Sequence, residues 1–173
     1  AEYVAVPAAG LRPKPQRLSF AQSAAYGAAY LTAHVALVRR ARLEPGEWVL
    51  VHGAAGGVGL AAVDLAKALG ARAIAASASD DKLKIVAGEY APDATVNVTG
   101  GFREQVKAIR KLSDGGVFAA LDFVGAESST GFGLSCLRKG GRLVIVGLYG
   151  GALNIPLPFI PMNARIIQGS YVG

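Results

Sequence analysis

Seven residues, Gly53-Ala-Ala-Gly-Gly-Val-Gly59, carry the clearest chemical signal in the sequence. They follow an apolar, strand-like run that ends at His52, and a helix-like run begins directly after them. A glycine turn in this position leaves backbone N–H groups free at a helix N-terminus, where a phosphate accepts hydrogen bonds. Gly56 allows a pyrophosphate to approach the backbone, and Gly59 allows the helix to pack closely on the strand. The spacing therefore predicts a dinucleotide site.

The motif departs from the usual G-x-G-x-x-G at its first glycine, where Ala54 stands after Gly53. Glycines also occur in strand–helix turns that bind nothing, so the triplet alone is weak evidence. Here the apolar run before it and the helical run after it both match the dinucleotide context, which favours binding. An alanine at this place enlarges the turn without forbidding a ligand.

The end of the second expected strand indicates which dinucleotide is bound. ARAIAAS ends on Ser77, where an acidic residue would hold the two ribose hydroxyls of NAD. A serine leaves space for a 2′-phosphate, and Lys82 lies one helical turn beyond, so NADP(H) is favoured over NAD(H). Lys82 is equally compatible with an ordinary solvated helix residue. Asp80 and Asp81 are the alternative ribose acids, although acids that begin a helix are expected there for helix stability alone.

The elements that position these residues alternate regularly after residue 47. Apolar strands are expected at 48–53, 71–77, 94–98, 117–124, 142–148 and 165–170, and helices at 59–70, 80–90, 102–112 and 128–140. The strands are nearly continuous in Val, Ile, Leu and Ala, which is typical of a parallel sheet buried on both faces. The pattern predicts an α/β Rossmann fold, a doubly wound parallel sheet of six strands in the order 3-2-1-4-5-6 with helices on both faces.

The chain is expected to form a single dinucleotide-binding domain over residues 1–173. Within it, residues 1–18 are a proline-punctuated connection, residues 19–42 a leading helix with Ser19 as N-cap, and residues 47–173 the Rossmann core.

Composition excludes several classes of protein. The net charge is +6, but the basic residues are scattered, so no nucleic-acid partner is expected. The single cysteine, Cys136, rules out a disulfide framework and is expected to be a buried thiol. No apolar run is long enough for a membrane span, and no signal peptide opens the chain, so a cytoplasmic setting is expected.

Segments along nearly the whole chain resemble the medium-chain dehydrogenase/reductase family, especially its quinone-oxidoreductase and alcohol-dehydrogenase members. They are AEYVAVP, LSFAQSAA, LTAHVAL, LEPGEWVLVHGAAGGVGLAAVDLAKALGA, ALDFVG, LRKGGRLVIVGLYGG and GSYVG. The resemblance implies hydride transfer between a nicotinamide cofactor and a carbonyl, alcohol or enone. Family members are about twice as long, which implies that the substrate domain is absent and that this chain alone is inactive.

The resemblance also implies cofactor contacts at matching positions. Thr32 would lie near the nicotinamide, Ala55, Gly56, Gly57 and Val58 at the pyrophosphate, and Ser77 and Lys82 at the adenosine ribose. Phe123, Val124 and Gly125 would lie against the nicotinamide ribose, and Gly147, Leu148, Tyr149, Ser170, Tyr171 and Val172 beside the carboxamide and ring. Thr32 is also compatible with a helix-internal hydrogen bond, and Tyr149 with loop packing. No residue is a convincing acid–base catalyst.

Zinc is not expected in this chain. The resemblance places a zinc-ligating cysteine within Tyr26–Leu31, where none occurs, and His34 and His52 are more simply interpreted as packed or hydrogen-bonded residues. The family implies a homodimer or homotetramer, with the proline-rich segment NIPLPFIPMN near the contact or simply covering the core. The alternatives are a non-enzymatic dinucleotide-binding or nucleic-acid-binding relative on the same fold, and an adenosyl-methionine methyltransferase.

Overall fold

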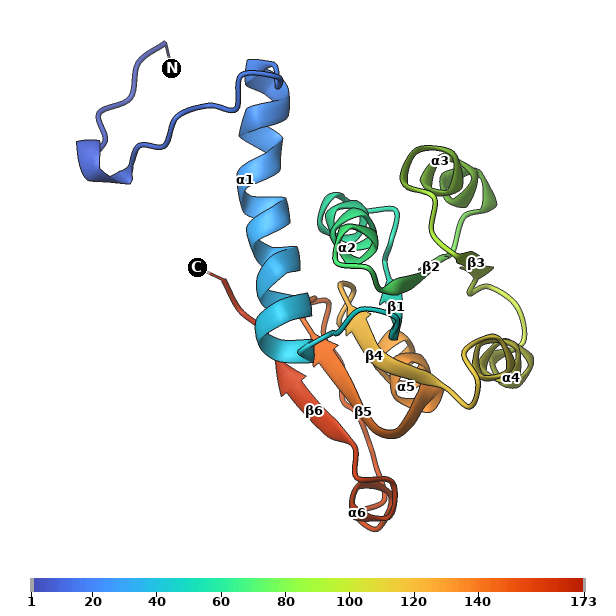
Figure 1. Ribbon diagram of the computed structural model, residues 1–173. Helices are drawn as coiled ribbons and strands as arrows, with labels where there is room; N and C mark the ends of the chain where they lie inside the picture. Colours follow the sequence, from blue (N-terminus) through green and yellow to red (C-terminus); the bar gives the residue numbers. More distant parts are fainter. Residues whose placement is uncertain (1, 173) are drawn as a thin grey trace.

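A computed structural model describes residues 2–172, and its core is one parallel sheet in the order β3-β2-β1-β4-β5-β6 (Figure 1). The strands are β1 Trp48–His52, β2 Arg72–Ser77, β3 Ala94–Asn97, β4 Val117–Asp122, β5 Leu137–Ile145 and β6 Ile166–Gly169. The predicted α/β class and strand order are therefore confirmed. Because all the strands run in the same direction, their carboxyl ends lie along the same edge of the sheet.

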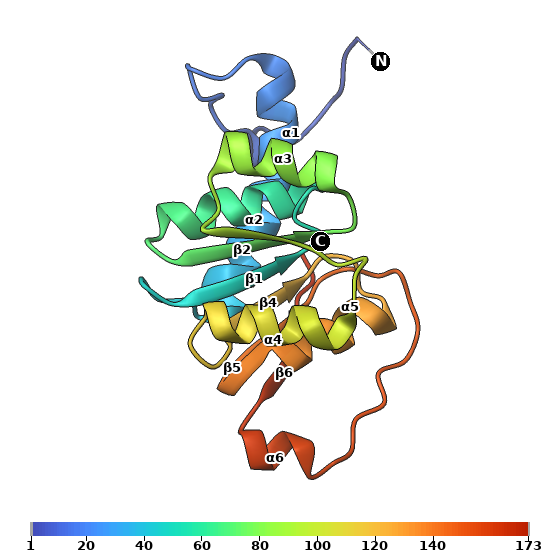
Figure 2. The ribbon, with the colours of Figure 1, turned by 90° about the vertical axis from the view of Figure 1, so that its right-hand side faces the viewer.

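Helices cover both faces of this sheet (Figure 2). They are α1 Phe20–His34, α2 Gly57–Ala68, α3 Asp80–Tyr90, α4 Phe102–Leu112, α5 Glu127–Cys136 and the short α6 Phe159–Asn163, with the 3₁₀ turn η1 at Ala8–Gly10. Helices α1, α2 and α3 lie on one face, and α4, α5 and α6 on the other.

Alternate strand residues divide the core into two apolar clusters. Val49 and Val51 of β1 face the side of α1 and α2, where Leu37 and Val63 are also buried. Leu50, between them in sequence, belongs to the opposite cluster with residues of α4 and α5. This two-sided burial explains why the strands are apolar at almost every position. It also places the side chains of His52 and Asp122 on the α4–α5 face, in phase with Leu50 and Ala120.

The leading helix differs from the regular helix expected over 19–42. Ser19 caps it as predicted, in a capping box with Gln22. After His34 the chain continues as η2, a π-helical segment at Val35–Ala41, which ends at Arg42 with a φ of +54°. This segment packs against β4 and β5, and its residues Ala36, Leu37 and Ala41 are all buried.

The fourth expected helix was too long, because residues 137–140 belong to a strand. Helix α5 ends at Cys136, and Leu137 is already extended and pairs with Val117 of β4. Gly140 has a φ of +74°, and a Cβ at Gly141 would lie 3.0 Å from the carbonyl oxygen of Arg138. These glycines permit a bulged strand that a helix could not continue through.

Candidate dinucleotide-binding site

The glycine turn links β1 to α2 and is fixed to the neighbouring strand by its backbone. The amides of Gly53 and Ala54 both donate to the carbonyl of Ala76 in β2, at 3.1 Å. Gly53 has a φ of +79°, so it makes the reversal itself, while Ala54 is completely buried. The departure from the usual motif therefore places a small apolar side chain in the core.

Two glycines of the turn have different roles. A Cβ at Gly59 would lie 2.2 Å from the carbonyl oxygen of Gly53, so only glycine allows α2 to approach the turn this closely. A Cβ at Gly56 would have 3.5 Å to that same oxygen, and Gly56 is exposed. Gly56 is the N-cap of α2 and has no side-chain cap. Gly57, the first residue of α2, is exposed as well, so the start of the helix is open to solvent, which fits an anionic pyrophosphate.

Ser77 ends β2 and is half-buried. Its Oγ accepts a hydrogen bond from the amide of Ser79 at 3.4 Å, and Ser79 in turn caps α3 by accepting from the amide of Lys82. Lys82 is exposed in the first turn of α3. The serine and the lysine are therefore held on one short segment, and the two acids that lie between them in sequence begin α3.

Both alternative ribose acids already have partners within the protein. Asp80 accepts a hydrogen bond from Nδ2 of Asn97 at 2.7 Å, which joins the start of α3 to the end of β3. Asp81 forms an exposed ion pair with Lys84 at 3.1 Å. Their positions in the first turn of α3 agree with the helix-stabilising interpretation.

The end of β4 carries a buried carboxylate that organises the neighbouring loop. Asp122 is 1 % exposed, and its Oδ1 accepts from the amides of Val124 and Gly125 at 2.9 and 3.0 Å. Its Oδ2 accepts from the hydroxyls of Ser129 and Thr130 at 2.9 and 2.7 Å. Sequence reasoning missed these three polar residues. The available signal was an aspartate inside the apolar run VFAALDFV, since a buried acid must be hydrogen-bonded.

The same residue holds a second loop through its backbone. The carbonyl of Asp122 accepts from the amides of Val146 and Gly147 at 2.9 and 3.0 Å. Beyond them, the amide of Tyr149 donates to the carbonyl of Val124 at 3.1 Å. The loops that follow β4 and β5 are thus joined to each other beyond the end of the sheet.

Glycines make this junction possible. A Cβ at Gly125 would lie 1.9 Å from the carbonyl oxygen of Gly147, and a Cβ at Gly147 would lie 2.1 Å from the carbonyl carbon of Val124. Gly125 also has a φ of +72°. At these two predicted cofactor positions, glycine is therefore needed for the contact between the loops, whether or not a cofactor binds there.

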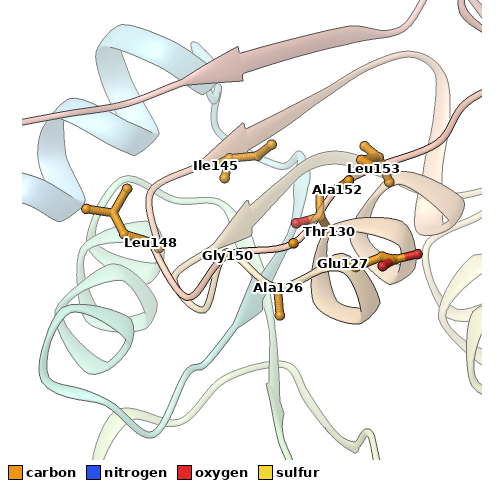
Figure 3. A pocket seen from close by; sticks show the side chains of 11 residues that line it. Ala126, Glu127, Thr130, Ile145, Leu148, Gly150, Ala152 and Leu153 are labelled. Carbon is orange, nitrogen blue, oxygen red and sulfur yellow. The ribbon is translucent and has the colours of Figure 1, made fainter.

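A cavity of about 350 Å³ lies beside this junction (Figure 3). Gly125, Glu127 and Thr130 line it from the α5 side, and Ile145, Gly147 and Leu148 from the β5 side. In Figure 3, Leu148 and Glu127 lie at opposite ends of it. Leu148 and Tyr149 are more than four-fifths exposed, so the loop after β5 presents apolar side chains outward.

The remaining predicted contacts come from β6 and α1. Ser170 is buried and its amide donates to the carbonyl of Ile145 at 2.9 Å, which places the end of β6 beside the loop after β5. Tyr171 is exposed and Val172 half-buried. Thr32 lies half-buried in the last turn of α1. The predicted positions other than Thr32 thus follow the carboxyl ends of strands or begin the helices after them, along one edge of the sheet.

Helix α1 is joined to the glycine-turn helix by a polar contact that the sequence did not suggest. The hydroxyl of Tyr30 donates to Asp64 of α2 at 2.5 Å. Burial, together with this hydrogen bond, raises the pKa of Tyr30. The contact joins α2 to the helix that carries Thr32.

The residues at hand do not fit a metal centre. No group of three or more His, Cys, Asp and Glu side chains within residues 2–172 is arranged to hold a metal ion. His34 is exposed on α1, whereas His52 is buried at the end of β1. Burial raises the pKa of the Cys136 thiol to about 12, so this cysteine is neutral, as expected for a packed residue.

The chain is similar to known proteins along most of its length. A family model described as zinc-binding dehydrogenase matches residues 57–173. The chain belongs to this family, within the medium-chain dehydrogenases/reductases. The chain is 34 % identical to a mouse quinone oxidoreductase over 93 % of its length and 47 % of that protein. It is 37 % identical to a quinone oxidoreductase-like protein 2 homolog of Nematostella vectensis, over 97 % of its length and 44 % of that protein.

Solved structures of family members are similar. An NAD-dependent alcohol dehydrogenase superimposes with a TM-score of 0.88 at 36 % identity, over 98 % of this chain and 49 % of the other. The quinone oxidoreductase of Thermus thermophilus, whose complex with NADPH is known, gives 0.83 at 33 % identity, over 99 % and 54 %. The chain spans about half the length of the relatives that it matches.

No helix among residues 2–172 is long and apolar enough to cross a membrane.

Proposed function

We propose that this chain is the cofactor-binding part of an oxidoreductase that transfers hydride between a nicotinamide dinucleotide and a carbonyl, alcohol or enone. The observation that carries the proposal is the accessible N-terminus of α2 behind the glycine turn, in a chain of this family. The nicotinamide supplies the hydride chemistry. The residues of this chain bind the cofactor and orient it, and the names of the relatives favour a quinone as substrate.

The proposed cofactor position follows the edge of the sheet. The pyrophosphate lies at 55–58, where the amides of α2 are accessible, and the nicotinamide end lies at the junction of the loops after β4 and β5, beside Ser170–Val172 and Thr32. The adenosine ribose lies at Ser77. This arrangement is supported by the order of the strands, because the switch point between β1 and β4 lies in the middle of the edge.

We further propose that NADP(H) is preferred over NAD(H). Ser77 stands where an acid would repel a 2′-phosphate, and Lys82 lies exposed at the N-terminus of α3. Asp80 and Asp81 are engaged with Asn97 and Lys84. A 2′-phosphate there would gain from the lysine charge and from the positive end of the helix dipole.

Calorimetric titration of the 173-residue chain with NADPH and NADH tests both proposals. We expect tighter binding of NADPH, and we expect Ser77→Asp to weaken NADPH binding by roughly tenfold or more through charge repulsion. Lys82→Ala should weaken NADPH and leave NADH unchanged. Lys84→Ala is the matched control, because this lysine lies on the same helix and pairs with Asp81. Tighter binding of NADH by the unmodified chain would contradict the NADP(H) preference.

The chain is proposed to act as one domain, with residues 1–18 as the connection to a substrate domain and 47–173 as the Rossmann core. Self-association into a homodimer or homotetramer is supported by the sheet edge at β6, where Ile166 and Ile167 are each 38 % exposed. We expect no steady-state quinone reduction by the chain alone. Measurable turnover would contradict this expectation.

A further inference from the structure

The net charge of the chain is concentrated at the amino edge of the sheet, where the strands begin, opposite the edge that carries the proposed cofactor site. This edge is formed by the last turn of each helix and the residues that lead into the next strand. The ranges are 38–48, 65–72, 87–94, 109–117, 133–142 and 160–166. They contain eleven of the 18 Lys and Arg residues and five of the 12 Asp and Glu residues, which gives +6. The remaining seven residues of each sign cancel, so the whole net charge lies at this edge.

The positive charge gathers where β4, β5 and β6 begin and where η2 ends, because η2 packs against β4 and β5. We call this part the basic edge, and it comprises residues 39–42, 109–117, 137–142 and 164–166. It holds nine Lys and Arg residues and one acid, Asp114. The ion pairs within residues 2–172 are Lys67–Asp93 and Lys84–Asp81, so no basic residue of the basic edge is paired there. Charges that are scattered in the sequence are thus brought together by the fold and left unneutralised.

Two guanidinium groups of the basic edge lie close together. Arg110 of α4 and Arg165, which precedes β6, both donate to the carbonyl of Leu137, at 2.7 and 2.8 Å. Burial lowers the pKa of Arg165 from its ordinary value, and the charge of Arg110 adds to this effect. Like charges held this close repel each other. The pair therefore adds positive charge beneath the surface of the basic edge, which an anionic partner would offset.

Arg40 and Arg142 are half-buried arginines on the η2 side of the basic edge. Arg142 lies two residues before Val144 in β5, so its side chain is on the face of the sheet that η2 covers. In both arginines Nε is buried and has no hydrogen-bond partner among the described residues. The side-chain stems are therefore packed against the protein, and the charged ends are the parts left to reach a partner. Side chains held in this way lose less conformational entropy on binding than mobile ones.

Arg138 and Lys139 extend from the bulge of β5. Both are exposed, as is Gly140, whose φ is +74°. Successive residues of a regular strand point to opposite faces, whereas this bulge exposes two basic side chains in succession. The helix dipole favours positive charge at the end of a helix, which accounts for Lys111 in the last turn of α4. A bulge offers no such stabilisation, so the fold itself gives no reason for Arg138 and Lys139 to be basic.

The basic edge lies away from both ends of the described chain. Figure 1 shows the N- and C-terminal ends on the side where β5 and β6 end, whereas these strands begin on the opposite side. The proposed pyrophosphate position at 55–58 follows the carboxyl end of β1. A partner at the basic edge therefore leaves the cofactor edge free.

The composition of the basic edge favours a protein as the partner. Seven of its nine basic residues are arginine, which is enriched at protein interfaces, whereas lysine is depleted there. Anionic lipid attracts lysine and arginine alike. Leu112, beside Lys111, is 45 % exposed, and Met162, three residues before Arg165, is 74 % exposed. A phosphate backbone has no apolar groups to cover these side chains, whereas an acidic protein segment with apolar residues does.

We propose that the basic edge is a docking surface for an acidic protein segment that also carries apolar side chains. Its carboxylates pair with Arg138, Lys139 and the ends of Arg40 and Arg142, and its apolar side chains cover Leu112. The inference goes beyond the proposed function and does not depend on it, because no residue of the basic edge belongs to the proposed cofactor site.

Binding of labelled probes tests the class of partner. The probes are an acidic peptide of Glu and Leu, the same peptide with Gln for Glu, a peptide of Glu alone, duplex DNA, and vesicles of phosphatidylserine and phosphatidylcholine. We expect the peptide of Glu and Leu to bind most tightly, less so as salt is raised, and the Gln peptide not to bind. Tighter binding of the duplex or the vesicles would overturn the choice of partner. No binding of the acidic peptide at low salt would overturn the inference.

Charge-matched variants test the location. Arg138→Gln with Lys139→Gln removes two exposed charges from the basic edge, and Arg103→Gln with Lys84→Gln removes the same two residue types elsewhere. We expect affinity for the acidic peptide to fall about fivefold or more in the first double variant and less than about twofold in the second. Equal losses would show attraction to net charge alone and would overturn the inference.

NADPH affinity and folding are the remaining controls. Both double variants should keep the circular dichroism spectrum and the NADPH affinity of the unmodified chain. If the basic-edge double variant does not fold, Lys139→Glu decides against Lys84→Glu, with the larger loss of peptide affinity expected for Lys139→Glu. Parallel losses of peptide and NADPH affinity would indicate a structural change and overturn the docking surface. A chain that binds the peptide and no dinucleotide would overturn the proposed function and leave this inference standing.

Discussion

The glycine turn before α2 and the loop junction after β4 and β5 lie on the same sheet edge, yet they use their backbones in opposite ways. At the glycine turn, α2 begins without a side-chain cap, so its first amides are accessible to a ligand. At the junction, the amides of Val124, Gly125 and Gly147 are all bound within the protein. The first region leaves backbone donors free for a ligand, whereas the second uses its donors to hold two loops together.

The two regions contain glycine for different reasons. Gly56 has space for a side chain, so the fold does not require glycine there, and the role proposed for it is to let a ligand approach. Gly125 and Gly147 have no such space, so glycine is needed there for the two loops to meet. Substitutions in the two regions should therefore separate binding from stability.

The largest expected effect is at the junction. Gly125→Ala places a Cβ 1.9 Å from a backbone oxygen at a φ of +72°, so we expect a loss of at least about 4 kcal/mol in the free energy of unfolding. Gly131→Ala in α5 is the matched control, because no atom lies within 4 Å of its added Cβ, and it should be neutral or stabilising by up to about 1 kcal/mol. Urea unfolding measures both. Similar stabilities of the two variants would contradict the tight junction.

Removal of the Asp122 carboxylate should have the second-largest effect. Asp122→Ala leaves two amides and two hydroxyls without their buried acceptor, so we expect roughly 3 kcal/mol of destabilisation. We also expect weaker binding of NMNH, which is the nicotinamide half of the cofactor. Affinity for 2′,5′-ADP, which is the adenosine half of NADP(H), should change much less, because the loops that Asp122 holds lie at the proposed nicotinamide end. Thermal unfolding and calorimetry provide the two measurements.

Two variants separate positioning from a general loss of stability. Asp122→Asn keeps one oxygen acceptor for the amides and should recover part of the NMNH affinity. Asp93→Asn removes a carboxylate that accepts from Lys67 and the amide of Ala73, both at 2.8 Å, away from the site. It should leave the affinity for both half-ligands unchanged. A parallel loss of both affinities in Asp122→Ala would argue against a positioning role.

The next prediction concerns a substitution in the glycine turn alone. Gly56→Ala should leave the midpoint of urea unfolding nearly unchanged and the free energy of unfolding within about 0.5 kcal/mol, because its Cβ stays 3.5 Å from the carbonyl of Gly53. Dinucleotide affinity should fall about tenfold or more, since the methyl group stands where the pyrophosphate approaches. Unaltered NADPH affinity in this variant would place the phosphate elsewhere.

The smallest expected effect concerns pH. The pKa of folded His52 lies below the usual value of 6.5, so on acidification the unfolded chain takes up a proton that the folded chain does not. Stability should therefore fall as pH falls below about 6.5, and His52→Phe should show a shallower fall over the same range. Urea titrations between about pH 7 and pH 5 compare the two proteins. Identical pH dependence would show that His52 titrates alike in both states.

The sequence predicted most of the fold because its signals are local. The apolar strands, the glycine turn and the cap at Ser19 depend on neighbouring residues, and the strand order follows from the alternation of strands and helices. The boundary of α5 was wrong for a reason of the opposite kind. LSCLRKGG has the composition of a helix end, and only pairing of Leu137 with Val117 makes its second half a strand.

The candidate site was predicted less completely because its geometry depends on contacts distant in sequence. The junction joins the residues after β4 to those after β5, and no local sequence pattern predicts that Gly125 contacts Gly147. Nor does any spacing show that His52, with its unpartnered Nδ1, lines a cavity formed with α4 and α5. Asp122 was visible as an acid in an apolar strand, but its partners became clear only in three dimensions.

The strand order has a consequence for the assembly of this edge during synthesis. Strand β1 pairs with β2 on one side and with β4 on the other, although α2, β2, α3, β3 and α4 come between β1 and β4 in the chain. A nascent chain that has not yet reached Val117 can close β1, β2 and β3 into a half-sheet, which carries the glycine turn and an open β1 edge. The glycine turn is therefore synthesised well before the loops after β4 and β5 that complete the same edge of the sheet.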